Sequence, residues 1–167
     1  AGLWLAPFSV EKASSVYKEH PDWLVQDLEK DEPAEYWGIH ALDLTHPAAR
    51  DYLRGVFTDV FDAWGYDYVK LDFLMHACQP GRRYDKTKTR AGAYREAMGV
   101  IRECAGEDRF ILGCGSPMGP ALGLVDGMRI GTDVSSRWYI PMNTAGWPEG
   151  NCCIKSSIVQ AAGRQWM

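Results

Sequence analysis

The sequence predicts an α/β fold in which parallel strands alternate with helices, with four strands that amount to about half of a (β/α)8 TIM barrel. Short apolar runs of strand length recur along the chain, at 2–8, 66–73, 110–114 and 128–130. Amphipathic helical segments lie between several of them, and glycines end these segments. The tight spacing of strand and helix favours βα units around one parallel sheet.

The first third of the chain predicts short elements. A buried strand is expected over 2–8, and a short helix over 9–19 with Ser9 as its cap. A turn rich in Asp and Glu occupies 26–35, and an extended piece follows over 39–44. These pieces are expected to join the first barrel strand to the next helix.

The clearest helix begins after Pro47 and ends at Gly65. Its apolar positions follow one helical face: Leu53, Val56, Phe57, Val60, Phe61 and Trp64. A second helix is expected over 89–105, with four residues directed inward: Ala91, Tyr94, Met98 and Ile101. An irregular loop over 135–150 and a helical segment over 151–166 complete the prediction.

The composition of the chain argues against several classes of function. The chain has 167 residues and a net charge of −4 without a basic stripe, which argues against nucleic-acid binding. No apolar run reaches the ~20 residues of a membrane span, and no secretion signal opens the chain. The five cysteines are odd in number and form no metal-ligand pattern. We therefore expect a cytoplasmic protein with reduced thiols, no metal, no cofactor and no membrane partner.

Lys70 and Asp72 are the strongest candidate site. They lie two positions apart at the end of the strand 66–73, so strand alternation directs both to the same side. At the mouth of a barrel, Lys70 would lower the pKa of Asp72 and keep it anionic, and such a carboxylate can attack an anomeric carbon. The alternative is a buried structural Lys–Asp pair.

Arg129 and Asp133 form a second candidate site. The four-residue separation, with Gly131 inside it, allows the loop to fold back and join guanidinium to carboxylate. A carboxyl group here that keeps its proton would be a general acid, and two carboxyl groups with different roles are what a glycosidase requires. The alternative is a salt bridge within a loop.

Other candidates are weaker. Trp4 has small neighbours on its strand face, which leaves room for a sugar ring to stack on it, although a core Trp is an equal alternative. Cys114 and Ser116 lie in a glycine-rich turn, where Ser116 could bind a sugar hydroxyl and Cys114 could simply be a small buried thiol. Asp43 is expected to hold the start of the following helix rather than to touch a substrate.

Six segments together resemble the catalytic domain of α-galactosidases of glycoside hydrolase family 36. They are Gly2-Leu3-Trp4-Leu5-Ala6-Pro7-Phe8, His20-Pro21-Asp22-Trp23, Ala41-Leu42-Asp43-Leu44, Lys70-Leu71-Asp72-Phe73, Gly113-Cys114-Gly115-Ser116-Pro117 and Met128-Arg129-Ile130-Gly131-Thr132-Asp133. The resemblance covers nearly the whole chain. It implies that residues 1–167 are a fragment of a single (β/α)8 catalytic domain, from about its third to its sixth strand.

The resemblance also implies an activity, the retaining hydrolysis of terminal α-linked galactose in melibiose or raffinose. It gives Asp72 the role of nucleophile and Asp133 that of acid/base, with their carboxyl groups ~5–5.5 Å apart. It implies that four further residues contact or line the galactose site: Trp4, Lys70, Cys114 and Arg129. One departure is Thr132, because relatives commonly carry Pro just before the acid/base.

Several alternatives stay open at this point. The substrate could be another sugar, such as an α-N-acetylgalactosaminide, or galactose could be transferred to an acceptor instead of to water. A non-catalytic fragment that binds carbohydrate is a further alternative. The expected partner is a small oligosaccharide, and a homo-oligomer is one open arrangement for the complete enzyme.

Overall fold

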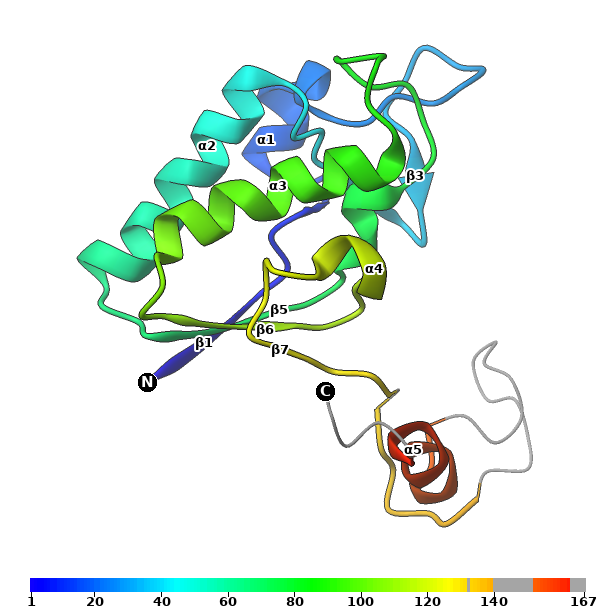
Figure 1. Ribbon diagram of the computed structural model, residues 1–167. Helices are drawn as coiled ribbons and strands as arrows, with labels where there is room; N and C mark the ends of the chain where they lie inside the picture. Colours follow the sequence, from blue (N-terminus) through cyan, green and yellow to red (C-terminus); the bar gives the residue numbers. More distant parts are fainter. Residues whose placement is uncertain (132, 140–151, 163–167) are drawn as a thin grey trace. The chain divides into compact units, whose positions relative to one another are not determined.

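A computed structural model describes residues 1–131, 133–139 and 152–162 (Figure 1). The chain divides into two compact units, Ala1–Gly127 and Met128–Met167. None of the described helices has the length and apolar character needed to cross a bilayer.

A parallel sheet supports the first unit. Its order is β1-β5-β6-β7, formed by Gly2–Leu5, Tyr68–Leu71, Phe110–Gly113 and Gly127–Met128. β1 pairs in parallel with β5 along its whole length, and β5 pairs in the same way with β6. The predicted parallel sheet is therefore confirmed, with strands shorter than the apolar runs that indicated them.

Two long helices, α2 (Pro47–Thr58) and α3 (Arg90–Ala105), lie together over one face of this sheet (Figure 1). A π-helical segment, η2 (Asp59–Ala63), continues α2. The wider turn of η2 shifts the helical period, so the side chain of Trp64 is exposed instead of buried as predicted. The prediction for α3 holds for three of its inward residues, whereas Ala91 is exposed in the first turn.

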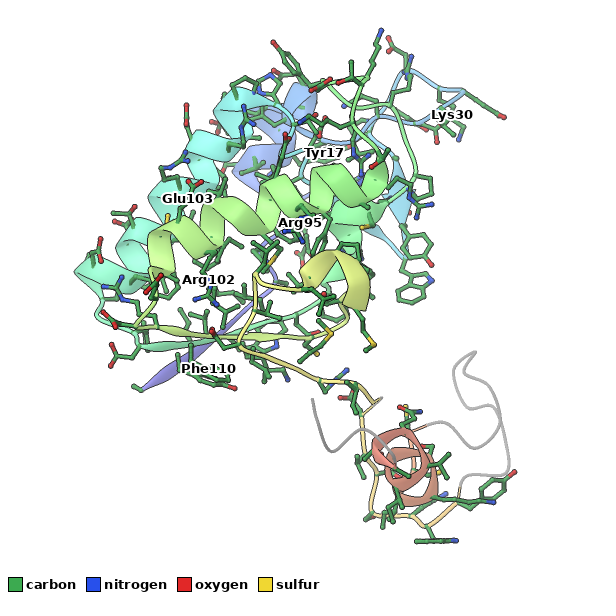
Figure 2. All side chains as sticks on the ribbon, in the orientation of Figure 1. Tyr17, Lys30, Arg95, Arg102, Glu103 and Phe110 are labelled. Atoms are coloured by element: carbon green, nitrogen blue, oxygen red, sulfur yellow. The ribbon has the colours of Figure 1, made fainter. Side chains whose placement is uncertain are left out.

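The core of the first unit lies between the sheet and these helices. Its fully buried members include Leu53, Phe57, Phe61, Val69, Leu71, Tyr94, Met98, Ile101 and Ile111. Figure 2 shows Glu103 where α3 meets α2, and its carboxylate lies 3.0 Å from Arg54. The apolar spacing read from the two helices thus positions them on the strands that end at the candidate site.

A small antiparallel sheet adjoins the barrel strands in sequence. Its order is β2-β4-β3, formed by Ser9–Val10, Ile39–Ala41 and Glu35–Tyr36. The helix predicted over 9–19 is wrong in its first half, because Ser9 begins β2 and the helix α1 covers only Ser15–Glu19. Its cap is Ser14, whose side chain accepts a hydrogen bond from the Tyr17 N–H.

Four short helical segments complete the part of the chain that the structure describes: η1 (Pro21–Trp23), η3 (Leu74–Cys78), α4 (Met118–Ala121) and α5 (Ile154–Ala161). Arg95, labelled on α3 in Figure 2, donates to the carbonyl oxygens of Pro120 and Leu122 and so fixes the end of α4. Of the predicted loop over 135–150, only 135–139 lie within the described residues. The helical segment predicted over 151–166 is confirmed at α5, with 151 and 163–166 outside the described residues.

Candidate active site

Asp72 is held by backbone hydrogen bonds that continue the parallel ladder. Its N–H donates to the Leu5 carbonyl at 2.8 Å, and the Cys114 N–H donates to the Leu71 carbonyl at 2.8 Å. Asp72 and Cys114 therefore follow directly on β5 and β6, at the carboxyl edge of the sheet. In a parallel α/β sheet this edge is where ligands bind.

The carboxylate of Asp72 is surrounded by donors from three strands. The Trp4 indole N–H donates to Oδ2 at 3.1 Å, and the Phe73 N–H donates to Oδ1 at 2.9 Å. The side chain of Cys114 also donates to this carboxylate. The Lys70 ammonium lies 3.9 Å from Oδ2, which agrees with the prediction that strand alternation directs the two side chains to one side.

These contacts hold the pKa of Asp72 below its usual range. Burial is the largest single influence and opposes ionisation, but favourable groups together outweigh it. In decreasing order they are the Cys114 side chain, the Phe73 N–H, the Trp4 indole and the Lys70 charge. The predicted direction of the shift is confirmed, although Lys70 contributes less than the hydrogen bonds do.

The segment after Asp72 has an unusual backbone. Phe73 adopts the left-handed conformation, with φ of 53°, and directly precedes η3. The loop after β6 supports it, because the Met75 N–H donates to the Gly115 carbonyl at 2.7 Å. A Cβ on Gly115, whose φ is 55°, would stand 3.4 Å from the Phe73 backbone N and Cα. Glycine is thus required where the two loops meet.

Ser116 follows β6 near this edge, and its side chain forms a hydrogen bond with a residue of α3. Its hydroxyl is 2.6 Å from that of Tyr94 on α3, and burial raises the pKa of Tyr94 to about 12 despite this bond. Sequence reasoning missed this partner because the two residues come from different elements. The contact predicted between Ser116 and a sugar hydroxyl stays a prediction.

Arg129 and Asp133 both belong to the second unit. Arg129 Nη1 donates to Asp133 Oδ1 at 2.7 Å, so the predicted folding back of this loop is confirmed. The Asp133 side chain is 84% exposed within the described residues. Thr132, between them, lies outside the described residues. The expected spacing between the carboxyl groups of Asp72 and Asp133 stays a prediction.

Asp43 has the structural role expected of it. Its Oδ1 accepts from the Thr45 N–H at 3.1 Å and from the Thr45 hydroxyl at 2.8 Å, while Oδ2 accepts from the Tyr84 N–H at 2.7 Å. The buried carboxylate therefore joins the segment before α2 to the loop before α3.

The first unit contains a cavity of about 700 Å³, which sequence reasoning did not foresee. Trp4 and Phe73 line it, together with Trp37 from the turn between β3 and β4 and His76 from η3. His76 Nδ1 lies 2.8 Å from the Ser9 hydroxyl, and burial lowers the pKa of this imidazole. A Trp-Gly pair between two short extended segments was the available signal for this turn.

The arrangement suits nucleophilic chemistry on a sugar. Asp72 combines a lowered pKa with donors that fix its orientation, so it stays an anion whose oxygens are positioned for attack. The Trp4 ring, 53% exposed, supplies an aromatic surface next to it.

The known proteins that this chain resembles include several alpha-galactosidases. A family profile described as Melibiase matches residues 1–105. Alpha-galactosidase 2 of Pediococcus pentosaceus is 34% identical over 80 residues, which are 48% of this chain and 11% of that protein. The alpha-galactosidase of Escherichia coli is 29% identical over 105 residues, which are 61% of this chain and 14% of that protein.

Solved structures of alpha-galactosidases are also similar to this chain. TtGalA, an alpha-galactosidase from Thermus thermophilus in complex with p-nitrophenyl alpha-D-galactopyranoside, is 40% identical with a TM-score of 0.69, and the match covers 83% of this chain and 28% of that chain. The GH36 alpha-galactosidase AgaA from Geobacillus stearothermophilus shares the fold at 23% identity, with a TM-score of 0.59 and coverage of 76% and 19%. The described sheet is thus part of a (β/α)8 barrel, which confirms the predicted fold class.

Proposed function

Because the chain belongs to the melibiase family, we propose that it carries part of the active site of a retaining α-galactosidase. The observation that supports this proposal most is the environment of Asp72, an anion held at the carboxyl edge of the sheet by donors in β1 and directly after β5 and β6. The chain spans 11% of the first curated relative and 28% of the Thermus structure, so the activity is proposed for the complete protein.

In the first step, an oxygen of Asp72 attacks the anomeric carbon of the galactoside and the bond to the leaving oxygen breaks. Asp133 gives its proton to that oxygen, so the sugar alcohol leaves neutral and a galactosyl ester of Asp72 forms. In the second step, Asp133 removes a proton from water, which attacks the anomeric carbon and frees Asp72. Two inversions at one carbon give net retention.

The donors around Asp72 have a defined part in this cycle. They stabilise the carboxylate before attack and after release, while it carries its negative charge. Lys70 and Trp4 are proposed to contact the galactose ring as well, and Cys114, Ser116 and Arg129 to line the same site. The fixed position of Asp72 reduces the entropy that the attack would otherwise cost.

The proposed substrates are galacto-oligosaccharides of the melibiose and raffinose type. TtGalA, the relative at 40% identity, has also been solved in complex with stachyose, which supports an oligosaccharide as the small-molecule partner. The cytoplasm stays the predicted location on the ground of the odd cysteine count. A homo-oligomer stays one open arrangement.

The test is covalent labelling of the complete protein with a slow-turnover fluorinated α-galactosyl donor, followed by intact mass and peptide mapping. We expect one galactosyl adduct on the peptide that contains Asp72. The Asp72→Asn variant, which lacks the nucleophilic carboxylate, should take up no label. Labelling of another carboxylate, or hydrolysis without any adduct in the folded protein, would contradict the proposed role.

A further inference from the structure

The hairpin between β3 and β4 carries a large aromatic residue in a rare conformation. Tyr36 pairs with Ile39, so the turn consists of Trp37 and Gly38 alone. Both have positive φ, 55° and 78°, as a two-residue hairpin turn of this hand requires. Asn is the usual first residue of such a turn, and a bulky residue there is an outlier that calls for a functional explanation.

The rings of this hairpin connect to the segment next to Asp72. Tyr36 stacks on Trp37 with ring centroids 4.8 Å apart, and it meets His76 edge-on at 6.4 Å. Phe73 in turn stacks on His76, with ring centroids 6.0 Å apart. A series of aromatic rings therefore leads from the residue after Asp72 to the tip of the hairpin.

The same series borders open space. Trp4 and Trp37 both line the cavity of about 700 Å³, and the Trp37 side chain is 63% exposed. Ser9, Glu11, Ser14 and His76 bring polar atoms to a lining that is otherwise mostly aliphatic and aromatic. This volume is within the range of small-molecule sites, and mixed aromatic and polar walls suit a sugar, which has apolar C–H faces and hydroxyl edges.

We propose that Trp37, backed by Tyr36, binds the sugar unit next to galactose, the one that departs when Asp72 attacks. The proposal rests on the function proposed above, and it names the specificity-determining residue of that same site. Trp4 donates to the Asp72 carboxylate and lines the same cavity as Trp37, so one cavity wall connects the candidate nucleophile with the hairpin. The occupant is thus the leaving group of an oligosaccharide.

The test compares two donors that share galactose and differ in the leaving group. α-Galactosyl fluoride has no second sugar, whereas raffinose does. On the complete protein, Trp37→Ala should lower kcat/KM for raffinose about tenfold, the size expected for one lost ring contact, and leave kcat/KM for the fluoride within about twofold. Trp37→Phe keeps a ring and should retain most of the activity on raffinose.

Trp64→Ala is the matched control, because Trp64 is 62% exposed in the same unit and lies away from the cavity lining. Trp64→Ala should leave kcat/KM unchanged for both donors. Equal losses on both donors in Trp37→Ala, or no loss on raffinose, would overturn the role of Trp37 while leaving the proposed activity intact. A wild-type protein that hydrolyses neither donor would overturn the proposed activity and this inference with it.

Discussion

The indole N–H of Trp4 donates a hydrogen bond of 3.1 Å to Oδ2 of Asp72, which lies 68 positions later in the chain. The parallel register explains this contact, since Trp4 in β1 is opposite Lys70 in β5 and Asp72 follows two residues on. A residue predicted to stack on sugar thus also orients the candidate nucleophile.

Trp4→Phe keeps an aromatic surface but loses the donor to Asp72. We expect kcat/KM for an aryl α-galactoside to fall about tenfold, because a hydrogen bond to a charged group contributes about 1.5 kcal/mol in partly exposed surroundings. Steady-state kinetics will measure this fall. Trp64→Phe, which changes an exposed Trp at the end of η2, should match the wild type.

Asp72→Gly should abolish turnover of aryl α-galactosides, because the attacking oxygen is removed. Azide fits the space left by the carboxylate and attacks from the same face, so added azide should restore release of a β-galactosyl azide, identified by NMR. Asp108→Gly, in an exposed turn, should keep wild-type turnover and give no azide product. Formation of the α-azide would assign the nucleophile elsewhere.

Cys114→Ala removes a donor that keeps the pKa of Asp72 low. Since the loss raises this pKa, the acidic limb of the pH profile of kcat/KM should move to higher pH. Cys114→Ser retains a hydroxyl donor and should move the limb less. Identical limbs in Cys114→Ala and the wild type would mean that this bond has no influence on ionisation.

Asp72 should also make folding stability depend on pH. Its pKa is lower in the folded than in the unfolded state, so its contribution is fully present above the unfolded value of about 3.9 and is lost as pH falls through the folded value. Urea unfolding of the wild type and of Asp72→Asn should show a difference that shrinks in this acidic range. A difference that is constant with pH would contradict the lowered pKa.

Gly115→Ala should disturb Asp72 from a distance. The new alanine would have to keep φ of 55°, which is strained for a residue with a Cβ and should cost about 1–2 kcal/mol of unfolding free energy. Its Cβ would also stand 3.3 Å from the Met75 sulfur, which would have to shift. Because the displaced segment follows Asp72 directly, kcat should fall as well. Gly119→Ala is the control, since its Cβ would meet nothing within 4 Å.

Asp43→Ala leaves the Tyr84 N–H and the Thr45 N–H without their acceptor. We expect the unfolding free energy to fall by about 3 kcal/mol, as measured by urea denaturation, because buried donors lose charged partners. Asp51→Ala, whose side chain is 80% exposed in a surface ion pair, should change it by less than about 0.5 kcal/mol. Equal losses of unfolding free energy in the two variants would contradict the structural role of Asp43.

Local sequence patterns were sufficient to predict the two long helices and the strand that carries the candidate site. The 3.6-residue period located α2 and α3, and the two-residue period placed Lys70 and Asp72 on one side of β5. Both signals depend only on neighbours along the chain. They failed where the geometry changed, as at η2, whose π-helical turn carries Trp64 out of the core.

The remainder depends on contacts between distant segments. The strands β2, β3 and β4 have two or three residues each, too few to show a period. The bonds from Cys114 to Asp72 and from Ser116 to Tyr94 join different elements, and no spacing in the sequence encodes them. The cavity is likewise formed by segments far apart in the chain.

Two parts of the first unit differ in how freely they can change. Asp72 and Cys114 are fixed by backbone bonds to neighbouring strands, so their positions depend little on side chains elsewhere. The β3–β4 hairpin is a surface turn whose tip residue is largely exposed. Under the role proposed for Trp37, selection or an engineer can exchange that turn to alter which saccharides are accepted, while the proposed nucleophile keeps its place.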